Sequence, residues 1–184
     1  MNQPFQEPFY ISVDVETAGP NPSTYSLLTI GACTIDEHPQ TFYIELKPVN
    51  NKMDPQAFAL HHLDLKRLVE RGVPPPEAMA SFENWLKQIT PDGMAPIFLS
   101  YDAPFEWMFI NDYFQRFLGR NPFGNAALDI KAFYAGLSGQ NWATITTGFL
   151  SERYLNNREF THHSLRDAID QAEIFRKLLT EPRR

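Results

Sequence analysis

Cysteine is almost absent from this chain, with Cys33 the single one among 184 residues. A disulfide framework is therefore excluded, and a reducing compartment such as the cytoplasm is the expected location. No apolar run approaches the roughly 20 residues needed to span a membrane. The polar start, Met1 to Pro4, does not resemble a signal peptide. The sequence thus predicts a protein without membrane contact.

Basic residues are also few, with 16 lysines and arginines against 22 acidic residues, for a net charge of −6. Nucleic acids prefer basic surfaces, so this balance argues against tight binding to long duplexes. It does not exclude an enzyme that grips a few phosphates. Two divalent cations would add four positive charges and bring −6 to −2.

Apolar residues are plentiful, at 43% of the chain, and 14% of the residues are aromatic. This composition favours a folded protein with a sizeable core over a disordered one. The sequence contains no internal repeat, no low-complexity tract and no long linker. We therefore expect a single domain over residues 1–184, with short N-terminal and C-terminal tails.

Short apolar runs bounded by glycine, proline or asparagine predict five strands, at residues 9–15, 27–35, 41–46, 96–100 and 128–130. Apolar residues at the 3/4 spacing of a buried helical face predict helices at 77–89, 104–118 and 165–179, and residues 50–71 have helical composition. A three-stranded meander followed by alternating helix and strand predicts a mixed sheet with helices packed on it.

Two carboxylates end the first predicted strand, in the sequence Asp14-Val15-Glu16. Side chains alternate along a strand, so both carboxylates point to the same face. Their repulsion is relieved if a cation lies between them, and Mg²⁺ or Mn²⁺ prefers such oxygen ligands. A D-x-E pair alone is also compatible with a solvated strand end, so the hypothesis requires further carboxylates downstream.

Two later segments supply them. Asp102-Ala103-Pro104-Phe105-Glu106 follows the fourth predicted strand, and His162 lies five residues before Asp167 near the last helix. In order, the three segments resemble the motifs of the DEDDh branch of the DnaQ-like 3'-5' exonucleases, a family that includes proofreading exonucleases, RNase T and oligoribonuclease. In the second motif this family usually has Asn and Asp where this chain has Asp102 and Glu106.

The resemblance implies an RNase H-like α/β fold, with a five-stranded mixed sheet flanked by helices and a second strand antiparallel to the rest. It implies two Mg²⁺ or Mn²⁺ ions held by Asp14, Glu16, Glu106 and Asp167, with His162 as general base. The implied function is a metal-dependent 3'-5' exonuclease. Such an enzyme would hydrolyse phosphodiester bonds at the 3' end of single-stranded or short DNA or RNA and release nucleoside monophosphates.

The resemblance also implies contacts to the substrate. Thr17 directly follows the first motif, and Phe105, beside the site, is placed to stack on a terminal base. In the family, residues near the start of the second strand contact the 3'-terminal nucleotide, which points to Leu28 and Ile30. Several relatives are homodimers, so a homodimer is a possible assembly.

Two assignments stay open at this stage. If the longer side chain of Glu106 cannot reach the metals, Asp102 is the competing ligand. Asp167 follows Ser164 by three residues, so it can form a capping box at the start of the last helix, act as a ligand, or do both. His61 and His62 have no motif support, and we expect them on a helix surface, at most near substrate.

Other classes of function also remain. The chain can be a catalytically inactive domain that binds nucleic acid or protein on the same fold. It can also be a globular domain in which the acidic residues serve only as caps. Cleavage of an oligonucleotide separates these alternatives from an enzyme.

Overall fold

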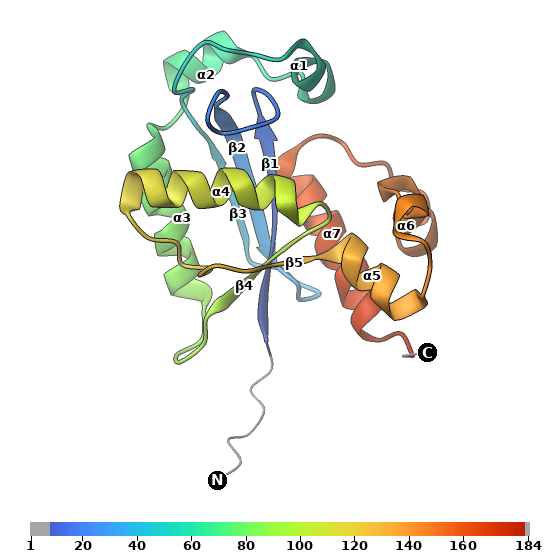
Figure 1. The fold of residues 1–184 in the computed structure, drawn as a ribbon. Coiled ribbons are helices and arrows are strands. Elements are labelled where there is room, and N and C mark those ends of the chain that lie inside the picture. The colour runs from blue at the N-terminus through green and yellow to red at the C-terminus, as the bar shows by residue number, and fades with distance from the viewer. Residues whose placement is uncertain (1–7, 183–184) are drawn as a thin grey trace.

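The structure is a computed structural model that describes residues 8–182 (Figure 1). The expected tails at 1–7 and 183–184 lie outside the described residues. The strands are β1 (Phe9–Thr17), β2 (Leu27–Thr34), β3 (Thr41–Glu45), β4 (Pro96–Ser100) and β5 (Ala127–Asp129). The helices are α1 (Pro55–His61), α2 (Leu65–Arg71), α3 (Pro75–Ile89), α4 (Ala103–Leu118), α5 (Ile130–Ser138), α6 (Thr147–Tyr154) and α7 (Ser164–Leu179), with a short 3-10 turn, η1 (Trp142–Thr144).

The five strands form one mixed sheet in the order β3-β2-β1-β4-β5. β2 is antiparallel to both of its neighbours, whereas β1, β4 and β5 run parallel to one another. This topology confirms the predicted sheet and its antiparallel second strand. Because β1 and β4 are parallel, their carboxyl ends lie at the same edge of the sheet, and the first and second motifs follow there.

Alternation along β1 separates the two faces of the sheet. Ile11, Val13 and Val15 are buried in the core cluster that also holds side chains of α3 and α4. Ser12 faces the other side, where its hydroxyl donates a 2.8 Å hydrogen bond to the carbonyl of Ala168 in α7. The alternation therefore turns the two carboxylates of β1 toward α7, as the sequence predicted.

Short polar side chains mark where several helices begin. The Asp54 carboxylate accepts a 2.7 Å hydrogen bond from the backbone N–H of Gln56 in α1. The Thr146 hydroxyl accepts one of 3.1 Å from Phe149 in α6. Such caps satisfy N–H groups that have no partner within the helix. Asp102 occupies the same position before α4, but its side chain makes no capping hydrogen bond.

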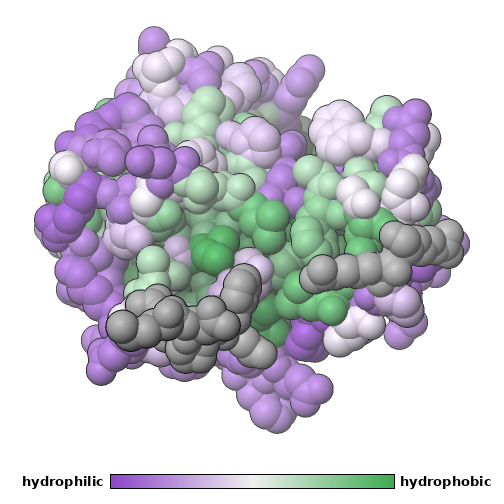
Figure 2. Space-filling model, turned by 60° about the horizontal axis from the view of Figure 1, so that its bottom comes forward, coloured by the Kyte–Doolittle hydropathy of each residue, from purple (hydrophilic) through white to green (hydrophobic). Residues whose placement is uncertain are grey.

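Apolar surface gathers at the end of the sheet where β1 begins. Figure 2 views the molecule from that end and shows a central apolar area with polar side chains around it. This end is opposite to the one where the motifs lie (Figure 1). None of the helices in residues 8–182 is both long enough and apolar enough to cross a membrane.

Gly31 allows α7 to approach the sheet beside Asp14. It lies opposite Asp14 in the antiparallel pairing of β1 and β2. A Cβ atom at Gly31 would lie 2.1 Å from the backbone nitrogen of Leu165, in the first turn of α7. The third motif lies in this turn, so the absence of a side chain at Gly31 sets how close Asp167 comes to Asp14.

We predict that Gly31→Ala destabilises the protein by about 1–3 kcal/mol, the usual cost of forcing extra atoms into a packed core. Gly136→Ala is the matched control, because apart from the helix's own backbone no atom lies within 4 Å of a Cβ added at Gly136, in the last turn of α5. That variant should gain about 0.5–1 kcal/mol. Urea unfolding measures both, and a Gly31→Ala variant as stable as the control would contradict the close approach of α7.

Candidate active site

A cavity of about 840 Å³ opens at the carboxyl ends of β1 and β4. Its walls come from β1, α1, the start of α4, α6, the segment before α7, and α7 itself. Six acidic side chains line it: Asp14, Glu16, Asp54, Glu106, Glu159 and Asp167. Four of these are the predicted carboxylates of the three motifs, so segments far apart in sequence meet in one cavity.

Asp14 and Glu16 enter the cavity from β1. Burial raises the pKa of Asp14 well above its usual range, and the nearby carboxylates of Glu106, Glu16 and Asp167 raise it further. Burial and the Asp167 carboxylate raise the pKa of Glu16 to about 8. The four carboxylates therefore lie close enough to oppose one another's ionisation.

Glu106 reaches the cavity from the first turn of α4, and only 8% of its surface is exposed. Burial raises its pKa to about 8. Its Oε2 atom is buried and has no hydrogen-bond partner among the described residues. Asp102, the competing ligand, is exposed and does not belong to the cavity wall.

Asp167 lies in the first turn of α7 and is 3% exposed. Its Oδ1 accepts hydrogen bonds from the backbone N–H of Thr161 at 2.8 Å and from the Thr161 hydroxyl at 3.1 Å, and its Oδ2 accepts one from the His162 N–H at 2.8 Å. The capping box with Ser164 is not formed, because the Ser164 hydroxyl is paired with Thr29 at 2.9 Å. Asp167 instead ties down the chain that precedes the helix.

His162 lies at the exposed rim of the site, in a left-handed backbone conformation with a φ of 53°. Ligand atoms of Glu16, His162 and Asp167 all lie within 4.8 Å of one another. The structure therefore brings the predicted histidine next to two of the predicted carboxylates. Its neighbour His163 points elsewhere and stacks on Tyr43, with 4.9 Å between the ring centres.

The donor set fits hard divalent cations. Carboxylate oxygens are the ligands that Mg²⁺ and Mn²⁺ prefer. The buried Oε2 of Glu106 lacks a partner among the described residues, and a cation would supply one. The raised pKa values have the same physical meaning, since buried carboxylates without a counter-ion retain protons.

The predicted substrate contacts divide into two groups. Thr17 and Phe105 line the cavity, and the Thr17 hydroxyl donates a 2.9 Å hydrogen bond to the carbonyl of Gly19. Leu28 and Ile30, by contrast, are fully buried in the core and do not line the cavity. A side chain without exposed surface cannot contact a nucleotide, so we do not retain these two residues as substrate contacts.

Gln171 was missed by the sequence reasoning. It is 2% exposed and lines the cavity one turn after Asp167, a spacing that could have found it. Its amide nitrogen donates a 2.7 Å hydrogen bond to Asp14 Oδ1, and its amide oxygen accepts one of 2.9 Å from the N–H of Tyr101. Gln171 therefore fixes how the Asp14 carboxylate is turned.

His61 was expected on a helix surface, and this expectation is wrong. The side chain is only 9% exposed, and it lines the cavity. Its Nδ1 accepts a 3.0 Å hydrogen bond from the N–H of Leu63, and its Nε2 is buried without a partner among the described residues. His62, the next residue, is exposed as expected. Nothing in the sequence separates His61 from His62. They differ because of the way α1 lies against the cavity, which is a tertiary contact.

Comparison with known sequences identifies close relatives, although no family model matches the chain. The chain is 40% identical over 167 residues to the 3'-5' DNA exonuclease Cap18 of Escherichia coli, covering 91% of this chain and 89% of that protein. It is 26% identical over 186 residues to ribonuclease T of Shewanella denitrificans, covering 95% of this chain and 82% of that protein.

Solved structures share the fold. The nuclease domain of 3'hExo, a DEDDh family member bound to rAMP, superimposes with a TM-score of 0.78 at 17% identity, covering 95% of this chain and 93% of that one. Escherichia coli exonuclease I in complex with a 5cy-dT13 oligonucleotide gives a TM-score of 0.71 at 14% identity, over 92% of this chain and 40% of that one. The RNase H-like fold of the DEDDh nucleases is thus confirmed.

We predict that the metal-free protein loses stability as pH rises from about 4.5 to about 8. The pKa values of Glu16 and Glu106 are raised to about 8, so the folded state keeps protons that the unfolded chain releases near pH 4.5. The unfolded state then binds fewer protons, and the free energy of unfolding falls across this range. Thermal unfolding in EDTA at several pH values measures the effect.

Added Mn²⁺ should raise the melting temperature more at pH 8 than at pH 5.5, because a cation stabilises the ionised carboxylates. Glu106→Gln is the control: it removes one buried charge, so it should stabilise the metal-free protein at pH 8 and weaken its response to Mn²⁺. A metal-free melting temperature that does not change between pH 5 and 8 would contradict the electrostatic account of the cavity.

Proposed function

The chain belongs to the DEDDh family of 3'-5' exonucleases, and we propose that Asp14, Glu16, Glu106 and Asp167 hold two Mg²⁺ or Mn²⁺ ions for the reaction of that family. The protein is thus a 3'-5' exonuclease that hydrolyses phosphodiester bonds at the 3' end of a nucleic acid. The observation that carries the proposal is the meeting of these four carboxylates, from β1, α4 and α7, in one cavity. The orphaned Oε2 of Glu106 supports Glu106 as the ligand from the second motif.

Different residues of the chain have different roles in the proposed reaction. When bound, the divalent ions supply a water of lowered pKa and neutralise the charge that grows on the phosphate. His162, beside Glu16 and Asp167, accepts the proton from the attacking water. Gln171 holds Asp14 in orientation. Phe105 offers a ring in the cavity wall for the terminal base.

Single-stranded DNA is the proposed substrate. The relative at 40% identity is named a DNA exonuclease, whereas the relative named a ribonuclease is 26% identical. The net charge of −6 disfavours tight binding to long duplexes and so favours single strands or short substrates. Each cleavage would release one nucleoside monophosphate.

Two further expectations belong to this proposal. On the family resemblance alone we propose a homodimer, which light scattering on the purified protein tests directly. The single buried cysteine fits a reducing location, and we propose the cytoplasm. Fractionation of cells expressing the protein tests that location.

We predict that the protein shortens a 5'-labelled single-stranded DNA oligonucleotide from its 3' end with Mn²⁺ or Mg²⁺, in a ladder that EDTA abolishes. A matched RNA should be degraded more slowly. Asp14→Ala should lose activity but keep its circular dichroism spectrum, because it removes a carboxylate that three neighbouring carboxylates oppose and that is not part of the hydrophobic core.

The same gels test the alternative function. Retardation of the oligonucleotide without cleavage, with every metal tried, would make the chain a catalytically inactive binding domain. Equal rates on DNA and RNA would overturn the proposed substrate preference but not the exonuclease activity. A 5'-3' ladder would contradict the family assignment.

A second prediction concerns the ligand from the second motif. Glu106→Gln should lower activity at least about 100-fold, because it removes a charged ligand. Asp102→Asn should have little effect, since Asp102 is exposed outside the cavity. Glu106→Asp should keep activity, with Mg²⁺ more sensitive than Mn²⁺ to the changed reach. Steady-state rates with both metals measure the ranking.

The reverse ranking, with Asp102→Asn inactive and Glu106→Gln active, would transfer the ligand role to Asp102. Calorimetric titration of Mn²⁺ into each variant without nucleic acid is the control. It separates loss of metal binding from loss of a later step, and only Glu106→Gln should bind Mn²⁺ more weakly than the wild type.

A further inference from the structure

The segment between α6 and α7, residues 155–163, carries His162 and forms one wall of the cavity. Asn157, Glu159 and Phe160 of this segment line the cavity. Three of its residues, Asn156, Asn157 and His162, have positive φ angles of 55°, 61° and 53°. Asparagine tolerates this left-handed conformation, but for a histidine it costs about 1 kcal/mol or more. The segment therefore depends on contacts with the rest of the protein to keep its shape.

One end of the segment is held by Asp167, which accepts the N–H groups of Thr161 and His162 at 2.8 Å. In the proposed function this same carboxylate also binds the metal ions. The oxygens of Asp167 then have to accept these hydrogen bonds and bind the metal ions at the same time. A second anchor away from the metals would hold the segment independently of them.

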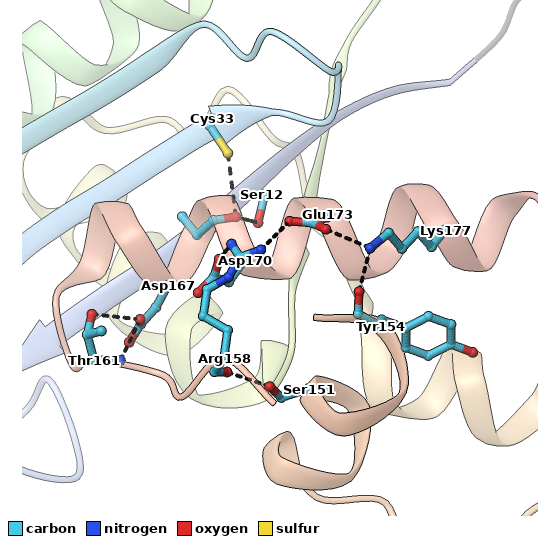
Figure 3. A network of polar contacts seen from close by, with 11 residues as sticks. Ser12, Cys33, Ser151, Tyr154, Arg158, Thr161, Asp167, Asp170, Glu173 and Lys177 are labelled. Atoms are coloured by element: carbon cyan, nitrogen blue, oxygen red, sulfur yellow. Dashed lines mark hydrogen bonds and ion pairs between the residues drawn. The ribbon is translucent and has the colours of Figure 1, made fainter. Parts of the chain in front are cut away.

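Arg158 supplies that anchor. Its guanidinium contacts the carboxylate of Asp170 and, at 2.9 Å, that of Glu173. Its own backbone carbonyl accepts a hydrogen bond from the hydroxyl of Ser151 in α6. Figure 3 shows these side chains reaching from α7 and α6 to the same short stretch of chain. Arg158 thus joins the segment to both helices, while its neighbours on either side face the cavity.

The two carboxylates that pair with Arg158 belong to a longer row of charged residues along one side of α7. Asp167, Asp170 and Glu173 are spaced by three residues, and Lys177 follows after four. Lys177 donates to Glu173 at 2.6 Å and also contacts the carbonyl of Tyr154 at the end of α6. The row begins with a proposed metal ligand and continues as a structural support, so one side of α7 serves both purposes.

The pair with Asp170 differs from an ordinary surface ion pair. Asp170 is 1% exposed, and its second oxygen has no hydrogen-bond partner among the described residues. Removal of Arg158 would leave a buried carboxylate without its counter-charge, which is costly, whereas exposed pairs contribute little. Loss of Arg158 therefore disturbs this part of the chain more than loss of an ordinary exposed pair would.

We infer that Arg158 is a positioning residue, which holds the general base His162 in register with the carboxylates through Asp170 and Glu173. The inference rests on the proposed role of His162. Arg158 itself touches neither the substrate nor the metals. It acts by fixing the chain four residues before the histidine, where a displacement of about 1 Å costs up to about 100-fold in rate.

The test compares Arg158→Met with Arg153→Met in the full chain, on 5'-labelled single-stranded DNA with Mn²⁺ under single-turnover conditions. Arg153 is the matched control, since its guanidinium is similarly exposed and pairs with Glu181 instead of the segment. Arg158→Met should cleave about 10- to 100-fold more slowly, and Arg153→Met should cleave at the wild-type rate. Arg158→Lys should recover part of the rate, because lysine can reach one of the two carboxylates.

Two readouts separate positioning from a general loss of stability. Calorimetric Mn²⁺ affinity without nucleic acid should be unchanged in Arg158→Met, while hydrogen exchange at the amides of Thr161 and His162 should become faster. In a His162→Ala background, Arg158→Met should cause no further loss of rate, because both changes disable the same group. The inference would be overturned if the rate losses of the two single variants multiplied in the double variant. It would also be overturned if hydrogen exchange at Thr161 and His162 were unchanged in Arg158→Met.

The double variant Asp170→Asn/Glu173→Gln keeps the test decisive if Arg158→Met does not fold, because it removes both ion pairs of Arg158 without leaving a buried carboxylate unpaired. It should also cleave more slowly and exchange faster at the same amides, and a wild-type rate would overturn the inference. The proposed role of His162 as the base fails in a different way. If His162→Ala cleaves as fast as the wild type, His162 is not the base, and Arg158 then positions nothing that matters to the rate.

Discussion

Mutual repulsion among four carboxylates is the constraint on which the arrangement of this protein depends. Asp14, Glu16, Glu106 and Asp167 share one cavity, and their proximity and burial raise the pKa values of the first three. Packing elsewhere must hold them together until cations arrive. The sheet supplies two of them from one strand, and two helices press the others against its carboxyl edge.

The structure meets this constraint with contacts outside the cluster. Gly31 lets the first turn of α7 lie directly on the sheet, and Ser12 ties the same helix to β1. Gln171 donates a hydrogen bond to Asp14, whose ionisation three carboxylates already oppose. The contacts that hold the cluster at its base are thus made by neutral groups, while its open side faces the cavity. A site built this way stays folded with its charges only partly neutralised.

Most of the fold and the four carboxylates could be predicted from the sequence, since alternation in β1 and helical spacing in α7 are local signals. Motif order placed Glu106 and His162 correctly in one cavity. Contacts between distant segments left no such signal. The burial of His61 depends on how α1 lies over the cavity, and the hydrogen bond from Gln171 to Asp14 joins residues 157 positions apart. Leu28 was assigned by family resemblance, which does not report that this side chain is fully buried here.

The position of α7 in the chain order has a consequence for synthesis. This helix packs against β1 and β2, which are made first, yet it spans residues 164–179 and is made last among the described elements. A nascent chain therefore exposes Asp14 and Glu16 long before their partners exist. The proposed site is therefore complete only after the segment that carries His162 and Asp167 has been made and packed.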